Sequence, residues 1–385
     1  MLSPQVADAQ TTPEPGIEVH GFVSQGFIKT SRNNYLARSE RGSFEFSEAG
    51  INFTKSLGDD LRVGLQLFAR DLGPLGNYTP QLDWFYLDYR PRDWFGLRAG
   101  RTKLPFGLYN ESSDIDAARV PILLPQSIYP VDHRDYLLAQ TGGEAYGEVP
   151  LGDAGAAEYR LYGGTINMGP PAAAPTPGIS VENLDVPYLV GGRLMWLTPV
   201  TGLQVGGSAQ ALRLDWTYRI APELQTPLQA AGLLPTDLNG RLPVKFRVNL
   251  FVASLEFARD DWLLSAEYSR WTGEFESRAP ALLPGHVVNE RYYIMGSYRV
   301  APWFTPGIYY SVYHPNVDQR SGRENVQRDL ALSFRYDLNA HWLLKLEGHY
   351  MHGTAALEES LNDGKKAKDL PENWGALLIK STAYF

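Results

Sequence analysis

Arginine and lysine side chains stand at alternate positions of several short apolar segments. In residues 61–70, Arg62 and Arg70 lie on one face of an extended chain, and leucine and valine side chains occupy the other. If the apolar face contacts lipid or a core, the basic face must line water. We expect one basic surface made of Arg62, Arg70, Arg98, Arg160, Arg193, Lys245, Arg247, Arg291, Arg299, Arg335, Lys345 and Lys380.

These side chains could act in two ways. Arginines and lysines around a narrow, water-filled passage attract anions, which predicts a mild anion preference. Alternatively, they pair with carboxylates on neighbouring strands and only stiffen the wall. The clearer acidic residues on the same face are Glu158, Glu267, Asp329 and Glu347, fewer than the basic ones, and the sequence leaves both interpretations open.

A second group of charged residues lies in one long connection, residues 104–138. Its chemistry-bearing side chains are Glu111, Asp114, Asp116, Arg119, His133 and Arg134. A connection of this length inside a compact protein is usually functional. We expect it to fold inward, face the arginine wall and form a constriction, and the alternative is an outer lid packed on neighbouring loops.

The elements that position these residues follow from a period-two pattern that begins at Ile17 and predicts strands almost throughout. Seven short connections carry tight-turn residues: 57–60, 90–94, 151–155, 198–202, 258–262, 300–303 and 338–342. Eight longer ones alternate with them: 31–41, 72–79, 104–138, 168–185, 217–243, 274–288, 315–326 and 355–372. Strict alternation requires sixteen strands with both chain ends on the short-turn side.

This layout predicts an all-β fold, a transmembrane antiparallel β-barrel of about sixteen strands that forms one domain over residues 17–385. A soluble β-sandwich would also alternate, but it would scatter long and short loops between both ends. The final strand ends in Phe385 and is expected to pair with residues 17–30, which removes both sheet edges. Residues 1–16 are expected to be a disordered segment or the remnant of an export signal.

Four tryptophans support the membrane interpretation. Trp94, Trp262, Trp303 and Trp342 each follow a short turn at the start of a strand. Amphipathic rings at one membrane interface occupy such positions. No run of about 18 uncharged apolar residues is present, so the sequence predicts no membrane-spanning helix.

Composition excludes several other classes of protein. The net charge of −8 argues against a nucleic-acid partner, and the absence of cysteine excludes disulfides and thiolate metal sites. His349 and His352 fall on opposite faces of a strand, so they cannot share a metal. No nucleophile elbow, phosphate loop or zinc-protease motif occurs. We therefore expect no enzyme activity, no metal and no cofactor.

One short motif carries a family resemblance. Gly100, Lys103, Pro105, Phe106 and Gly107 match a G-x-x-K-x-P-F-G segment at the end of the fifth expected strand. This segment resembles one in the phosphate-selective porins (porin O and P) and their relatives. The resemblance implies a homotrimeric porin for passive uptake in the outer membrane of a Gram-negative bacterium. Membrane lipid, lipopolysaccharide and small anionic or neutral solutes would be its partners.

Two alternatives to a general pore remain open at this point. One is a substrate-specific channel for phosphate or carboxylates. The other is a plugged barrel that serves as an adhesin or a structural membrane protein. The family's arginine ladder cannot be placed residue by residue on this sequence, so phosphate specificity does not follow from the resemblance.

Overall fold

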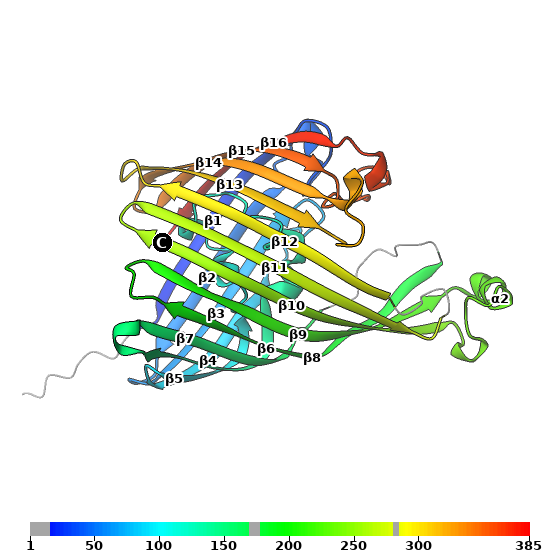
Figure 1. Ribbon diagram of the computed structural model, residues 1–385, viewed down its shortest axis with the longest axis horizontal. Helices are drawn as coiled ribbons and strands as arrows, with labels where there is room; N and C mark the ends of the chain where they lie inside the picture. The colour runs from blue at the N-terminus through cyan, green and yellow to red at the C-terminus, as the bar shows by residue number, and fades with distance from the viewer. Residues whose placement is uncertain (1–15, 169–177, 280–284) are drawn as a thin grey trace, which may run out of the picture.

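The computed structural model describes residues 16–168, 178–279 and 285–385, and the N-terminal segment predicted for residues 1–16 lies outside them except for its last residue. Sixteen antiparallel strands form a closed barrel in which each strand pairs with its sequence neighbours and β1 pairs with β16 (Figure 1). The strands are β1 (Glu18–Thr30), β2 (Phe46–Ser56), β3 (Leu61–Leu72), β4 (Gln81–Arg92), β5 (Phe95–Lys103), β6 (Ala139–Pro150), β7 (Ala156–Thr165), β8 (Ile179–Leu197), β9 (Leu203–Ile220), β10 (Arg241–Arg259), β11 (Trp262–Ser277), β12 (Gly285–Tyr298), β13 (Phe304–His314), β14 (Gln327–Asn339), β15 (Trp342–Gly353) and β16 (Asn373–Tyr384).

The predicted fold class and strand count are confirmed. The seven short connections join β2 to β3, β4 to β5 and so on to β14 and β15, and the eight long ones lie at the other end. The β10–β11 connection shows why turn residues are needed, because Arg259 pairs with Trp262 and leaves two aspartates to reverse the chain. The first of them, Asp260, has a left-handed φ of 53°, which Asp tolerates better than most residues.

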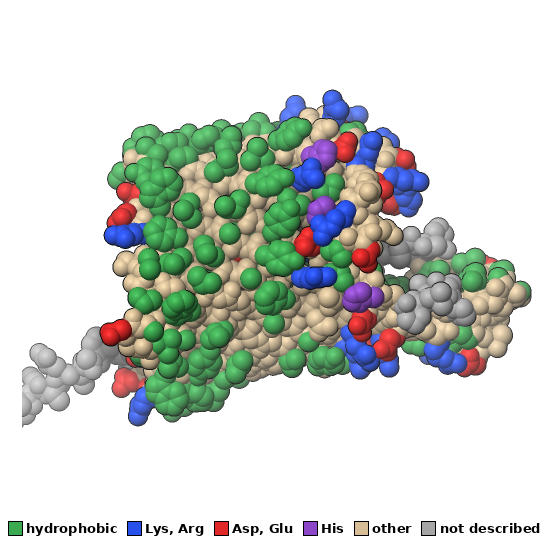
Figure 2. All heavy atoms as spheres, viewed as in Figure 1, with side chains coloured by type: hydrophobic (Ala, Val, Ile, Leu, Met, Phe, Trp, Pro, Cys, Tyr) green, Lys and Arg blue, Asp and Glu red, His purple; other side chains and the backbone are tan. Residues whose placement is uncertain are grey.

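Alternation along the strands places apolar side chains on the outer wall. Leu161, Leu194 and Ile294 are each about 60% exposed there, and hydrophobic side chains cover most of the wall that Figure 2 shows. Charged and histidine side chains gather at the long-loop end of the same face. The four tryptophans that follow short turns are all exposed at the opposite rim. Within the described residues, no helix is long and apolar enough to cross a membrane.

Four neighbouring strands, β8 to β11, have 16 to 19 residues each and project beyond the long-loop end of the barrel (Figure 1). The β9–β10 connection at their tip carries helix α2 (Pro222–Ala230). Ile220, Leu234, Leu242 and Val244 form a small apolar cluster beneath it. The projection therefore has its own core, separate from that of the barrel.

Inside the barrel, the long β5–β6 connection contributes to a large apolar cluster. Phe106, Leu124 and Ile128 from this connection are buried with Leu212 and Val252 of the wall. The chain is bent there into 3₁₀ turns (Asn110–Ser112, Asp116–Ala118 and Val131–His133) and the four-residue helix α1 (Arg134–Leu137). The interior of this barrel is thus partly apolar and partly ionic.

Candidate functional site

The connection 104–138 contacts wall residues on several sides of the barrel. Gly107 donates its backbone N–H to the Ser208 hydroxyl on β9, at 3.0 Å. Ile122 and Leu123 donate theirs to the Glu347 carboxylate on β15, at 2.6 and 3.0 Å. These buried, directional contacts hold the connection across the interior, and we refer to residues 104–138 as the inner loop.

Asp116 is the most deeply buried ionic anchor of the inner loop. The Lys345 ammonium lies 2.9 Å from one carboxylate oxygen, and the Thr382 hydroxyl lies 2.7 Å from the other. Lys380 is 3.7 Å away, and the side chains of Asp116, Lys345 and Lys380 are each 1% exposed. Burial alone would raise the pKa of Asp116, but Lys345, Lys380 and Arg119 hold this pKa well below its usual range. Asp116 is therefore ionised and attaches the loop to β15 and β16.

Asp114 forms a second anchor, to residues of β3 and β5. Its carboxylate accepts from the Lys103 ammonium at 2.5 Å and from the Gln66 amide at 3.1 Å, and Arg134 lies 3.5 Å away. Burial acts to raise the pKa of Asp114, but Lys103 and Arg134 lower it to about 2. Although Asp114 and Asp116 are two residues apart in sequence, they bind different cations and form no common metal site.

Glu111 joins the inner loop to two arginines of the wall. Its carboxylate lies 3.0 Å from Arg160 and 3.5 Å from Arg193. Arg160 also pairs with Glu144 on β6, and Arg193 pairs with Glu158 at 2.5 Å. The structure thus brings the expected basic wall and the expected acidic loop residues together as ion pairs.

Several other expected basic residues also have partners inside the barrel. Arg98 lies 3.1 Å from Asp88 and 3.4 Å from Glu144. Arg335 pairs with Asp337 at 2.7 Å and donates to two inner-loop carbonyls.

The remaining expected residues lie near the loop in different settings. Arg291 lies over the Trp271 ring at 3.5 Å and donates to the Ser127 carbonyl. Arg70 donates to the Val131 carbonyl, and Arg299 lies at the short-turn rim.

Lys245 and Arg247 point outward, although the sequence predicts that they line the interior. The neighbouring Val244, Leu250 and Val252 are buried toward the interior, so the intervening residues point outward. Arg247 pairs with Glu276 at 2.8 Å, and both side chains are nearly half exposed. The prediction for these two residues depends on the rule that the apolar face of a strand contacts lipid. On β10 the apolar face instead packs against the inner loop and the projecting core.

The sequence-based prediction misses several inward carboxylates, among them Glu48, Asp83, Asp88 and Glu144. Alternation along β2 and the end of β4 places Glu48 and Asp88 opposite lipid-facing Ile51 and Leu87, so pattern could have found these two. Asp83 lies at a register shift between β3 and β4. Glu144 lies in a Gly- and Ala-rich strand without contrast between faces.

The family motif has a local structural explanation. Gly100 has a φ of 132°, and a side chain there would meet the Phe85 carbonyl oxygen at 2.4 Å. Gly107 has a φ of 62°, and a side chain there would meet the Tyr129 hydroxyl at 2.4 Å. Between them, Phe106 is buried in the interior cluster. The motif therefore turns the chain from the wall into the lumen.

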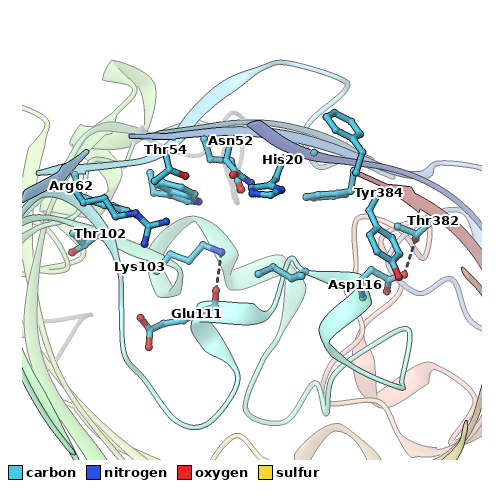
Figure 3. Close-up of a pocket in the computed structure, with 18 of the residues that line it drawn as sticks. His20, Asn52, Thr54, Arg62, Thr102, Lys103, Glu111, Asp116, Thr382 and Tyr384 are labelled. Atoms are coloured by element: carbon cyan, nitrogen blue, oxygen red, sulfur yellow. Dashed lines mark hydrogen bonds between the residues drawn. The ribbon is translucent and has the colours of Figure 1, made fainter. Parts of the chain in front are cut away.

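Two cavities remain open below the inner loop, on the short-turn side. One, of about 510 Å³, lies among β1 to β5 and β16, and we call it the vestibule (Figure 3). Its charged lining consists of three basic side chains, Arg62, Arg98 and Lys103, and two acidic ones, Glu111 and Asp116. The other, of about 580 Å³, lies beside the β10–β11 turn and is lined by four arginines and three aspartates.

No family sequence model and no curated protein sequence matches this chain. Solved structures do. The outer-membrane expressed OmpT of Vibrio cholerae is 12% identical, with 96% of this chain and 97% of that chain covered and a TM-score of 0.57. An anion-selective porin from Comamonas acidovorans is 12% identical, with 96% and 99% covered and a TM-score of 0.57. OmpF of Salmonella typhi is 13% identical, with 96% and 97% covered and a TM-score of 0.54. The chain shares the fold of these outer-membrane barrels.

Proposed function

We propose that the protein is a porin in the outer membrane of a Gram-negative bacterium and lets small hydrophilic solutes and ions diffuse passively. The observation that carries this proposal is a closed barrel with an apolar outer wall and water-accessible cavities inside. The inner loop is the constriction, and the short turns are periplasmic. The exposed tryptophans at the short-turn rim form the interfacial belt. The proposal assigns no catalytic reaction to the chain.

The proposed pore has a mild preference for anions. Most wall arginines are neutralised by carboxylates, so the strong field expected of a bare arginine wall does not arise. Both cavities nevertheless have one more basic than acidic side chain. A small excess of positive charge in a narrow passage favours anions. The similarity in fold to a porin described as anion-selective agrees with this preference.

The proposed assembly is a homotrimer in contact with membrane lipid and lipopolysaccharide. One solved structure of the Vibrio cholerae OmpT, with a TM-score of 0.53 and 11% identity, is described as a trimer form. The charged side chains at the long-loop end of the outer wall suit lipopolysaccharide head groups. Membership of the phosphate-selective porins remains part of this proposal, supported by the motif from Gly100 to Gly107.

Two rival functions differ from a general pore in what passes through the barrel. A substrate-specific channel would bind one solute class, and a plugged barrel would pass nothing. Because the inner loop fills much of the interior, a plugged barrel is the alternative function that must be tested first. Liposome swelling separates the rivals, since a general pore admits sugars of different shape and a plugged barrel admits none.

The test combines liposome swelling with the reversal potential in a salt gradient across a planar bilayer. We expect swelling with arabinose and other small sugars, and a reversal potential whose sign indicates anion selectivity. Heat-denatured protein in the same lipid provides the control. Absence of swelling and of channel steps would refute the pore, and cation selectivity would refute the anion preference alone.

A further inference from the structure

Arg62 differs from the other basic residues of the vestibule. Arg98 and Lys103 form ion pairs with Asp88 and Asp114. Arg62 is exposed to the cavity, and none of the ion pairs found among residues 16–168, 178–279 and 285–385 includes it. Figure 3 shows Arg62 and Lys103 extending into the same open space. An ammonium has three donors, and Lys103 uses two of them, on Asp114 and on the Glu111 carbonyl.

The acidic side chains of the vestibule do not cancel Arg62. Glu111 pairs with Arg160 and Arg193, and Asp116 pairs with Lys345. Among the described residues, the cavity therefore presents one planar guanidinium, that of Arg62, that forms no ion pair with a carboxylate. Such a group binds a carboxylate through two parallel hydrogen bonds.

An aromatic surface lines the same cavity. The rings of Trp84 and Tyr86 on β4 are stacked, with centroids 5.4 Å apart and planes 12° apart. Phe22 and Ile115 add further apolar lining. Arg98 already lies over the Tyr86 ring, 5.0 Å from its centroid, so Trp84 is the part of this surface against which a flat ring can pack.

Arg62 and the two aromatic rings lie on neighbouring strands, β3 and β4. Trp84 pairs with Gln66, and Gly64, which pairs with Tyr86, separates Gln66 from Arg62 along β3. At about 3.3 Å per residue, the Arg62 and Trp84 backbones lie roughly 14 Å apart. The Tyr86 ring lies between them, over Gly64, where a side chain would meet this ring at 2.9 Å. The cavity of about 510 Å³ beside these side chains has room for one ring with an attached carboxylate.

We propose that the vestibule is a binding site for small ring-bearing monocarboxylates, with the carboxylate on Arg62 and Lys103 and the ring against Trp84. Asn52 and His20 line the same space and can bind polar ring substituents (Figure 3). This inference rests on the proposed porin function and names a solute class for it. Inorganic phosphate fits less well, since it has no ring to pack against Trp84.

The test measures block of the potassium chloride current in planar bilayers by benzoate, acetate, benzyl alcohol and inorganic phosphate. We expect benzoate to halve the current at a concentration at least several-fold lower than each of the other three. Equal potency of benzoate and acetate, or stronger block by phosphate, would overturn the inference.

Two variants test separately the part of the proposed site that binds the carboxylate and the part that binds the ring. Arg62→Gln should raise the half-blocking benzoate concentration about tenfold, the typical effect of losing a hydrogen bond to a charged group. Trp84→Leu should bring benzoate and acetate close to each other. Arg247→Gln on the outer wall is the matched control and should leave the block unchanged. Unchanged benzoate block in Arg62→Gln would refute the site.

A failure of this inference is distinguishable from a failure of the porin function. Channels that conduct potassium chloride but show no preference for benzoate refute only the solute class. If the protein does not conduct, the pore is refuted, and calorimetric titration of the detergent-solubilised protein with benzoate then decides the binding site. Binding lost in Arg62→Gln would support the site, and no binding to the unmodified protein would overturn it.

Discussion

The two sides of the barrel interior use charge differently. On β15 and β16, Lys345 and Lys380 are buried against the inner loop by Asp116, and almost no water reaches them. On β3, Arg62 faces an open cavity. The comparison teaches that an inward basic residue can act on solutes only where it lines an open cavity. The sealed side gives the loop its position, and the open side gives the proposed pore a basic side chain that solutes can reach.

The largest effect is expected on the sealed side. Asp116→Ala leaves the buried Lys345 and Lys380 without their main counter-charge, so the free energy of unfolding should fall by about 3–5 kcal/mol. Urea unfolding in detergent, followed by the gel mobility of folded and unfolded forms, measures the change. Asp237→Ala, which breaks an exposed pair with Arg278, is the control and should change stability little. A small loss in Asp116→Ala would show that the loop is not held by this anchor.

This difference between the two sides also marks what the sequence could predict. Turn chemistry and period-two alternation identify all sixteen strands, because tight turns and lipid contact impose strong local rules. Alternation also assigns Arg62 and Arg98 correctly. It fails for Arg247, because the inner loop makes the interior as apolar as lipid at β10. Pairing across the barrel, as between Asp116 and Lys345, depends on contacts that local pattern does not contain.

A smaller effect is expected on the open side, in ion selectivity. A unit charge about 8 Å from a passing ion in water contributes about 0.5 kcal/mol, or roughly a twofold change in local concentration. Because the charge raises the anion concentration and lowers the cation concentration by this factor, Arg62→Gln should lower the anion-to-cation permeability ratio about fourfold, measured from the reversal potential. Arg247→Gln removes a charge from the outer wall and should leave the anion-to-cation permeability ratio unchanged. Equal effects of the two variants would contradict the separation of inside from outside.

The smallest effect is a pH dependence at one end of the inner loop. Burial, with help from Arg291 and against Asp132, lowers the pKa of His133 to about 4. The folded state therefore resists protonation of His133. The contribution of His133 to the free energy of unfolding is at its highest above about pH 6.5, where the side chain is neutral in both states, and it is lost as the pH falls toward 4. Asp114, with its pKa lowered to about 2, keeps its pairing over the same range.

Current fluctuations of single channels should therefore increase between pH 6.5 and 4.5 as this end of the loop loosens. The increase should be absent in His133→Gln, which cannot take up the proton. Fluctuations that increase equally in His133→Gln would assign the pH response to another group.

The central claim is that the inner loop narrows a conducting pore, and single-channel conductance tests it most directly. The unmodified protein should open in discrete steps, and deletion of residues 112–118, which removes both Asp114 and Asp116, should raise the conductance of each step. Steps of unchanged size in a deletion variant that folds and inserts, or no steps from the unmodified protein, would contradict the claim.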